Sequence, residues 1–165
     1  MTGGRRGALL LAAGLSFAAM GGCGFTLRRP PRLAIRTIAL VGFAPRSPLA
    51  EALRRELLQQ VSVLDDAAKA QVVLRALDDA RERSVVASTA AAQVRELQLR
   101  LKFNFRADTP GGRELIPRVE LLLKRDLSYS ETQALAKEAE EAELFREMQA
   151  DVVTQVLRRL AAVQV

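Results

Sequence analysis

Leu97-Gln98-Leu99-Arg100-Leu101-Lys102-Phe103-Asn104-Phe105 is the stretch that decides the fold. Apolar and polar side chains alternate along its whole length, which is the period of a β-strand with one buried and one wet face. A register slip of one residue would bury Arg100 and Lys102, so the pairing of this strand is firmly specified. The sequence therefore predicts a sheet with one face on a core and the other in solvent.

The segments on either side of this strand supply its partners. After it, Asp108-Thr109-Pro110-Gly111-Gly112 predicts a turn, and alternation resumes at Val119, Leu121 and Leu123. Before it, residues 72–77 are rich in β-formers, and the pattern returns at Val85-Val86 after the charged interval 78–83. The small, uncharged residues 88–92 are suited to a hairpin connection. An antiparallel arrangement follows for these three segments.

The N-terminal half predicts a strand–helix–strand unit. Thr37 to Gly42 forms a short apolar strand, and Ser47-Pro48 opens a helix, with Ser as N-cap and Pro in the first turn. One stripe of that helix carries Leu49, Leu53, Leu57 and Val61. Residues 61–64 form a second short strand, which can lie parallel to the first through a right-handed crossover.

A long amphipathic helix is expected at the C-terminus. Ser130 and Gln133 suit a capping box at its start. Its apolar stripe consists of Leu135, Ala139, Ala142, Phe145, Val152, Val156 and Leu160. Two amphipathic helices and a mainly antiparallel sheet with one polar face make a two-layer α+β sandwich, which we expect to be a single domain over residues 37–165.

The first two dozen residues have the layout of a bacterial export signal. Arg5 and Arg6 precede an apolar run over residues 8–19, and small residues lead up to Cys23. We expect residues 1–22 to be removed and Cys23 to be acylated, which makes the chain a lipoprotein; an ordinary secreted protein is the alternative. Residues 23–36 then form a Pro/Arg-rich tether. Gly24 stands where an Asp would retain the product at the inner membrane, so we expect the outer membrane.

Composition narrows the classes of function. The chain has no His and a single Cys, so the common nucleophile–base pairs and most zinc sites are unavailable, and we expect neither an enzyme nor a metal protein. The covalent lipid on Cys23 is the sole cofactor expected. A pI of about 10.4 favours an anionic partner. Nucleic acid is disfavoured by the export signal and by an aromatic content of 4%, but becomes the alternative if the signal is misread.

Three stretches, taken in order, resemble the LPS-assembly lipoprotein family LptE, also called RlpB. They are residues 23–28 (Cys-Gly-Phe-Thr-Leu-Arg), residues 94–99 (Val-Arg-Glu-Leu-Gln-Leu) and residues 132–138 (Thr-Gln-Ala-Leu-Ala-Lys-Glu). The resemblance implies two helices on one face of a four-stranded, mixed, mostly antiparallel sheet. It also implies a non-catalytic outer-membrane lipoprotein on the periplasmic side. Such a protein plugs the LptD β-barrel one-to-one, aids its assembly and helps to carry lipopolysaccharide to the outer leaflet.

The resemblance also suggests which residues bind lipopolysaccharide. The lysine of the Ala-Leu-Ala-Lys stretch is associated with that binding in the family, and here it is Lys137. Arg95 and Arg83 flank the hairpin connection, where relatives can carry a cation, and are expected to assist. All three residues can also be read as solvated surface cations. Two other classes of function stay open: a basic exported domain that binds another anionic ligand, and an exported enzyme or small-ligand carrier.

Overall fold

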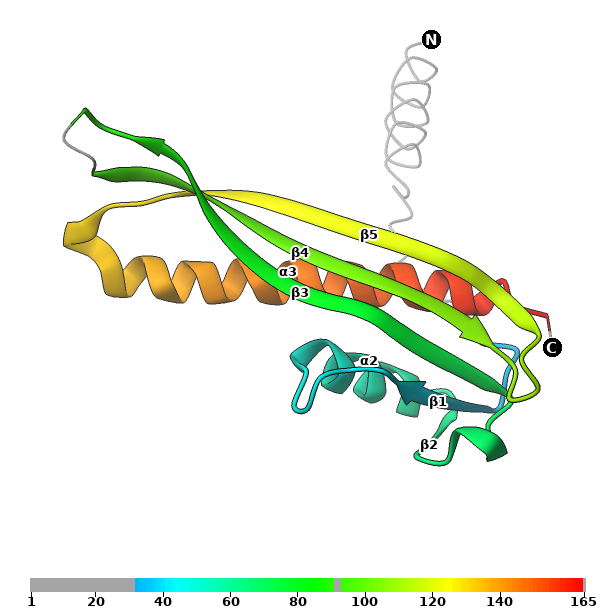
Figure 1. Cartoon of the computed structure of the whole chain (residues 1–165). Helices are drawn as coiled ribbons and strands as arrows, with labels where there is room; N and C mark the ends of the chain where they lie inside the picture. The colour runs from blue at the N-terminus through cyan, green and yellow to red at the C-terminus, as the bar shows by residue number, and fades with distance from the viewer. Residues whose placement is uncertain (1–31, 91–92, 165) are drawn as a thin grey trace, which may run out of the picture.

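The computed structural model describes residues 32–90 and 93–164. They form one five-stranded sheet, with strand order β2-β1-β3-β4-β5, and two α-helices. In Figure 1, α3 runs along the three long strands, and the β3–β4 hairpin extends to one end of the molecule. The elements are β1 (Thr37–Val41), α2 (Pro48–Leu58), β2 (Ser62–Leu64), the 3-10 turn η2 (Ala67–Lys69), β3 (Val72–Ser88), β4 (Val94–Asp108), β5 (Glu114–Ser128), the 3-10 turn η3 (Glu131–Gln133) and α3 (Ala134–Ala161).

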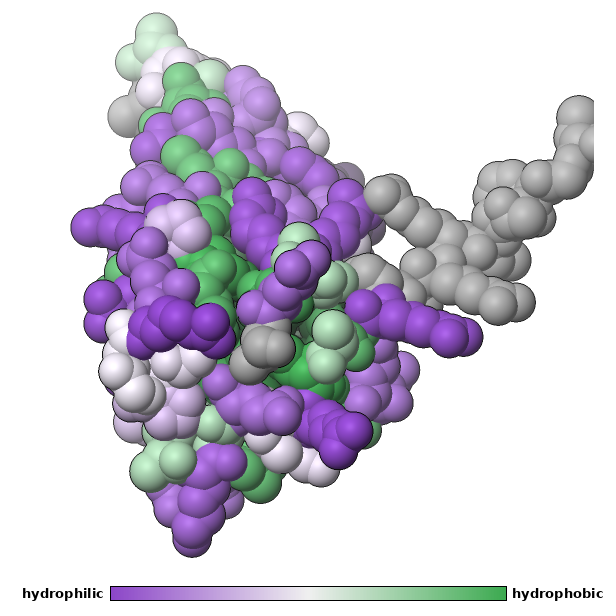
Figure 2. All heavy atoms as spheres, turned by 90° about the vertical axis from the view of Figure 1, so that its right-hand side faces the viewer, coloured by the Kyte–Doolittle hydropathy of each residue, from purple (hydrophilic) through white to green (hydrophobic). Residues whose placement is uncertain are grey.

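The alternating stretch lies in β4, at the middle of the long strands. Its apolar side chains, from Leu97 to Phe105, are all buried, as predicted. They share one core with Leu53 of α2 and Val152 of α3, so both helices cover the same face of the sheet. Viewed from the end opposite the hairpin, apolar side chains occupy the middle of the molecule between hydrophilic borders (Figure 2). The two-layer α+β sandwich is confirmed.

The number of strands corrects the expectation of a four-stranded sheet. The fifth strand is β2, which pairs in parallel with β1 over the register Thr37↔Ser62 to Ala39↔Leu64. The strand–helix–strand unit creates it, because α2 returns the chain to the free edge of β1. Ser47 begins α2 as predicted, since its hydroxyl accepts a hydrogen bond from the Ala50 amide at 3.1 Å.

The charged interval in β3 does not interrupt the strand, contrary to the sequence pattern. β3 runs without a break over 17 residues, and its pairing with β4 shifts at a β-bulge between Ala76 and Asp78. Beyond the bulge, Arg81 and Arg83 both point to the helix side of the sheet, where α3 supplies polar partners. The strand tolerates charges here because these partners satisfy them.

Two expectations for the C-terminal helix are wrong. The Ser130 hydroxyl contacts the Thr132 hydroxyl at 2.9 Å and makes no cap bond, so a 3-10 turn replaces the capping box. The buried stripe of α3 starts only at Phe145, and Leu135 is 83% exposed. In these first turns the side of α3 that faces the strands carries Lys137 and Glu141, which contact Ser128 and Arg83. Leu135 precedes Lys137 by two residues and therefore points to a different side of the helix.

The start of the described chain is already docked on the domain. Ile35 is buried in the core, and the Arg36 amide donates to Gln71 Oε1 at 2.7 Å. Cys23 and the predicted signal lie outside the described residues. Among residues 32–90 and 93–164, no helix is long and apolar enough to cross a membrane.

Candidate functional site

The predicted binding residues lie at one end of the molecule, which we call the hairpin end. It consists of the β3–β4 hairpin, the last residues of β5 and the first turns of α3 (Figure 1). Antiparallel pairing builds it: Val85 lies opposite Leu97, and Leu97 lies opposite Leu127. The Thr89 amide donates to the Gln93 carbonyl at 2.8 Å and closes the hairpin. This end therefore gathers residues from three segments that are far apart in the sequence.

Lys137 ties α3 to β5. Its ammonium donates to the Ser128 hydroxyl at 3.1 Å and to the Glu140 carboxylate at 2.8 Å, and its side chain is 14% exposed. This geometry differs from that of a fully solvated surface lysine. An ammonium has three N–H donors, so one remains after these two contacts.

Arg83 faces the same turns of α3 from the sheet. It lies opposite Leu99, so alternation directs it to the helix side. Its guanidinium approaches the Glu141 carboxylate at 3.3 Å, and Glu141 follows Lys137 by one helical turn. Arg83 and Lys137 are thus held on either side of one turn of α3.

Arg95 completes the group from β4. Its carbonyl accepts a hydrogen bond from the Tyr129 amide at 2.8 Å, next to the Ser128 that Lys137 contacts. Its guanidinium donates to the neutral side chain of Gln93 at 3.3 Å. Within the part of the chain that the structure describes, Arg95 has no ion-pair partner, unlike Lys137 and Arg83.

Exposed apolar side chains accompany these cations. Val85 and Val86 at the end of β3, and Leu135 at the start of α3, are three of the large apolar residues with more than a third of their surface in solvent. The sequence pattern missed this group, since it assigned Leu135 to the buried stripe. The sequence did contain a signal that this part of the helix is poorly buried: between Leu135 and Phe145 the stripe contains only alanines, which bury little apolar area.

Arg81, the nearest other arginine of β3, has a different environment. Its guanidinium lies over the Phe145 ring, 5.3 Å from the centroid, and donates to Gln149 Oε1. Gln149 in turn donates to the Pro48 carbonyl at 2.8 Å. Arg81 therefore joins β3 to both helices and belongs to the packing of the domain.

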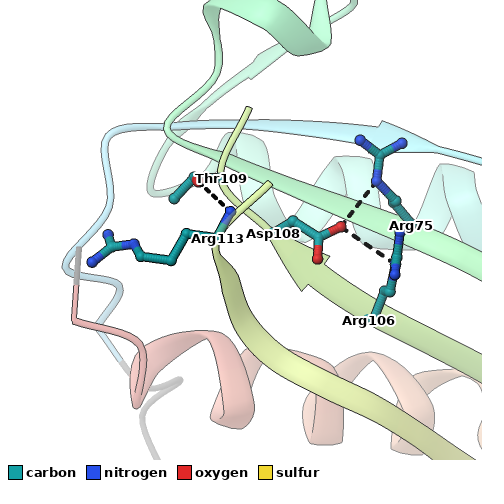
Figure 3. A network of polar contacts seen from close by, with 5 residues as sticks. All are labelled: Arg75, Arg106, Asp108, Thr109 and Arg113. Carbon is teal, nitrogen blue, oxygen red and sulfur yellow. Dashed lines mark hydrogen bonds and ion pairs between the residues drawn. The ribbon is translucent and has the colours of Figure 1, made fainter. Parts of the chain in front are cut away.

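A second polar cluster lies at the opposite end of the sheet (Figure 3). Buried Asp108 pairs with Arg75 at 3.0 Å and with Arg106 at 3.4 Å, while Arg113 points away from them. The Thr109 hydroxyl accepts from the Arg113 amide at 3.1 Å and shapes the turn that follows. This cluster fixes the end of the β3–β4 pair. Among residues 32–90 and 93–164, no group of three or more His, Cys, Asp or Glu side chains could hold a metal ion.

Comparisons with known proteins bear on this architecture. The family model LptE, described as lipopolysaccharide-assembly, matches residues 35–160. The LPS-assembly lipoprotein LptE of Photorhabdus laumondii is 29% identical over 158 residues, covering 94% of this chain and 86% of the relative. That of Yersinia enterocolitica is 30% identical over 161 residues, covering 94% and 76%.

Solved structures agree with the sequence relatives. An NMR structure of an uncharacterized lipoprotein B from Nitrosomonas europaea superposes with a TM-score of 0.71 at 28% identity, over 84% of this chain and 91% of that one. The crystal structure of rare lipoprotein B from Shewanella oneidensis gives 0.64 at 26% identity, over 77% and 95%. The chain therefore belongs to the LptE family of lipopolysaccharide-assembly lipoproteins, which are not enzymes.

Proposed function

We propose that this protein binds lipopolysaccharide at the hairpin end and plugs an LptD β-barrel, one copy per barrel, during transport to the outer leaflet. In this proposal, residues 1–22 are removed and acylated Cys23 anchors the chain to the periplasmic side of the outer membrane. The segment that follows Cys23 connects the anchor to the domain, whose core includes Ile35. Family membership supports a role in lipopolysaccharide assembly, and the geometry of the hairpin end supports the binding of lipopolysaccharide there.

The observation that carries the proposal is the mixed chemistry of the hairpin end. Lys137, Arg83 and Arg95 lie at this end of the molecule, as do the exposed Val85 and Leu135. Lipopolysaccharide presents phosphates together with acyl chains, so it needs cations and apolar side chains within one small area. The hairpin end offers both kinds of group.

Nearby carboxylates set the strength of this site. Lys137 is paired with Glu140 and Arg83 with Glu141, so a phosphate must compete with these acids. Arg95 faces no such competition from a paired carboxylate in the described chain. We therefore expect a salt-sensitive interaction of moderate affinity, in which the ligand can be released as well as held.

Charge reversal at Lys137 tests the binding proposal. We expect Lys137→Asp to weaken binding of purified lipopolysaccharide by about tenfold, since it replaces an attraction by a repulsion near the phosphate. Binding is measured on the full-length protein in detergent, and thermal unfolding should stay within a few degrees of the wild type.

The matched control is Lys69→Asp. Lys69 also makes an i,i+3 ion pair, with Asp66 at 3.2 Å, but lies on η2, away from the hairpin end. It should bind lipopolysaccharide like the wild type. Equal affinities for wild type, Lys137→Asp and Arg95→Asp would refute binding at the hairpin end.

A further inference from the structure

Among residues 32–90 and 93–164, no helix covers the face of the sheet opposite α2 and α3. The odd-numbered residues of β4 from Leu97 to Phe105 point to the core, so the even-numbered residues point to the other face of the sheet. Their register partners on β3 and β5 share that face. The turn η2 covers it only beside β1, where Ala39, Ala70 and Val73 form a small second core. We call the remainder, over β3, β4 and β5, the uncovered face.

Asn104 is the anomaly of this face. The alternation predicts it to be wet, yet it is 2% exposed, and its side-chain oxygen has no hydrogen-bond partner in the described structure. Its register partners are Asp78 and Glu120, whose side chains offer oxygen acceptors. No helix of the described chain lies over Asn104, so neighbouring side chains on the sheet bury it. Leaving a buried acceptor unpaired is unfavourable, and a donor from outside would remove that cost.

Exposed leucines lie next to Asn104. Leu122 is opposite Lys102, one pair along the same face, and is 47% exposed. Leu77 occupies the bulge directly before Asp78 and is 48% exposed. A polar group that needs a donor, with apolar side chains near it, is typical of a surface that a partner covers.

The charges of this face point to a protein partner and not to a polyanion. Lys102 pairs with Asp78 at 3.0 Å, and this hydrogen bond raises the pKa of Lys102 above its ordinary value, so the ammonium stays charged at neutral pH. Arg100 lies beside Lys124 and Arg75 beside Arg106, but Glu82, Asp108, Glu120 and Asp126 share the same face. The acids offset the bases, so a phosphate-rich ligand gains little there, whereas a wall of mixed polar side chains fits.

The area is sufficient for a stable contact. Three strands of about 15 residues, at roughly 3.3 Å per residue and 4.8 Å between strands, present about 700 Å². A standard protein interface uses about 800 Å² from each partner. The lumen of a transmembrane β-barrel is polar, which suits a face of this composition.

We propose that the wall of the β-barrel covers the uncovered face around Asn104 and Leu122, with a barrel side chain donating a hydrogen bond to Asn104 Oδ1. This inference rests on the proposed plug function and assigns the face that makes the contact. It is separate from the hairpin end, whose cations lie on the helix side of the sheet.

Two substitutions test it on the full-length acylated protein, co-produced with its LptD barrel and isolated through a C-terminal tag. Asn104→Leu removes the unpaired acceptor, so the protein without barrel should melt at the wild-type temperature or higher. The same variant should bind the barrel about tenfold more weakly, because the proposed hydrogen bond is lost. Weaker barrel binding together with an unchanged or higher melting temperature is expected of a residue that contacts the barrel, and not of one that only supports the fold.

Leu122→Ser should likewise weaken the complex without changing the melting temperature. Its matched control is Leu58→Ser on α2, where the leucine is 55% exposed on the helix side, and the control should retain the barrel. A photo-crosslinker at position 122 should capture the barrel. If it captures a second copy of the chain or lipopolysaccharide instead, the barrel is not the occupant and the inference falls.

The outcomes for the two proposals differ. If wild type co-purifies with the barrel while Asn104→Leu and Leu122→Ser retain it equally well, the assignment of this face is wrong and the plug function stands. If wild type brings no barrel, both fail.

Discussion

Leu101 occupies the centre of β4 with none of its surface exposed. Its register partners are Arg81 on β3 and Leu123 on β5, and its side chain belongs to the core shared with both helices. Arg81 lies opposite Leu101 on the same face, but its guanidinium is already held over the Phe145 ring and hydrogen-bonded to Gln149. The position therefore probes which face of the strand is buried.

We expect Leu101→Asp to unfold the domain. Burying an unpaired charge costs several kcal/mol, a large part of the total stability of about 5–15 kcal/mol for a single domain. Thermal unfolding followed by circular dichroism measures the effect. Leu135→Asp is the control, since that leucine is 83% exposed near the start of α3 and should melt like the wild type. A native melting curve for Leu101→Asp would show that the assigned faces of β4 are reversed.

Other single residues show how far local reasoning extends. The cap role of Ser47 is readable from Ser-Pro before an apolar stripe, but its hydroxyl also donates to the Asp79 carboxylate at 2.5 Å. Asp79 lies 32 positions away and is brought close only by the path of β3. The sequence therefore predicts the cap and not its partner, because the partner depends on tertiary packing.

At the scale of elements, the close approach of the chain after β1 to β3 depends on a glycine. Gly42 has φ of +81°, and a Cβ there would lie 2.3 Å from the Ala76 carbonyl oxygen. That oxygen is backbone in a paired strand, next to the bulge, so it cannot move aside cheaply. Gly112 has a similar φ of +86° but nothing within 4 Å, and Gly111 has neither constraint.

These three glycines give a graded prediction for substitution by alanine. Gly111→Ala should change the free energy of unfolding by less than about 0.5 kcal/mol. Gly112→Ala should cost about 1–2 kcal/mol from its left-handed backbone. Gly42→Ala should cost more than Gly112→Ala, because strain and a backbone clash combine. Urea denaturation measures the free energy of unfolding of all three variants. Equal losses of this free energy in Gly42→Ala and Gly112→Ala would mean that the chain after β1 can move away from β3 without loss of stability.

The elements that could be predicted from the sequence are those with a regular pattern of apolar residues or with clear cap and turn residues. β4, α2 and the turn over residues 108–112 follow directly from alternation, capping and turn chemistry. The continuity of β3 was not predictable, because its charges are satisfied by Gln149 and Glu141 of a helix far along the chain. The exposure of Leu135 was missed because a stripe of apolar residues does not show that the polar Lys137 and Glu141 occupy the side of α3 that faces the sheet.

The candidate site was predicted as a set of residues and not as a geometry. Lys137, Arg83 and Arg95 came from a family resemblance and from their places in the chain. Their ion pairs with Glu140 and Glu141, and the neutral partner of Arg95, required the structure. Periodicity identifies a face, but it does not identify which carboxylate a long side chain reaches.

At the scale of the whole molecule, the hairpin end is far from the point where the chain enters the domain. Arg36 lies beside the starts of β2 and β3, because the Ser62 amide donates to its carbonyl at 2.9 Å and its own amide donates to Gln71. From there to Val85, β3 runs about 40 Å along the sheet. The chain therefore enters the domain at the end opposite the candidate site.

This separation predicts that anchoring and ligand binding are independent. The test variant is Cys23→Ala, exported with an ordinary cleavable signal peptide in place of residues 1–22, so that no uncleaved signal holds it in a membrane. It should lose association with neutral phosphatidylcholine vesicles, because two or more acyl chains supply the stable hold and neutral lipid offers the tether's arginines no attraction.

The same variant should keep the wild-type melting temperature and the wild-type affinity for lipopolysaccharide. The melting temperature should not change, because the core starts near Ile35. The affinity should not change either, because residues 24–32 extend at most about 30 Å, too short to reach the proposed binding cations from the point where the chain enters the domain. Mass spectrometry of the wild-type N-terminal peptide should show acylated Cys23. An intact, unmodified N-terminus, or vesicle binding that persists in the variant, would show that something other than this cysteine holds the protein at the membrane.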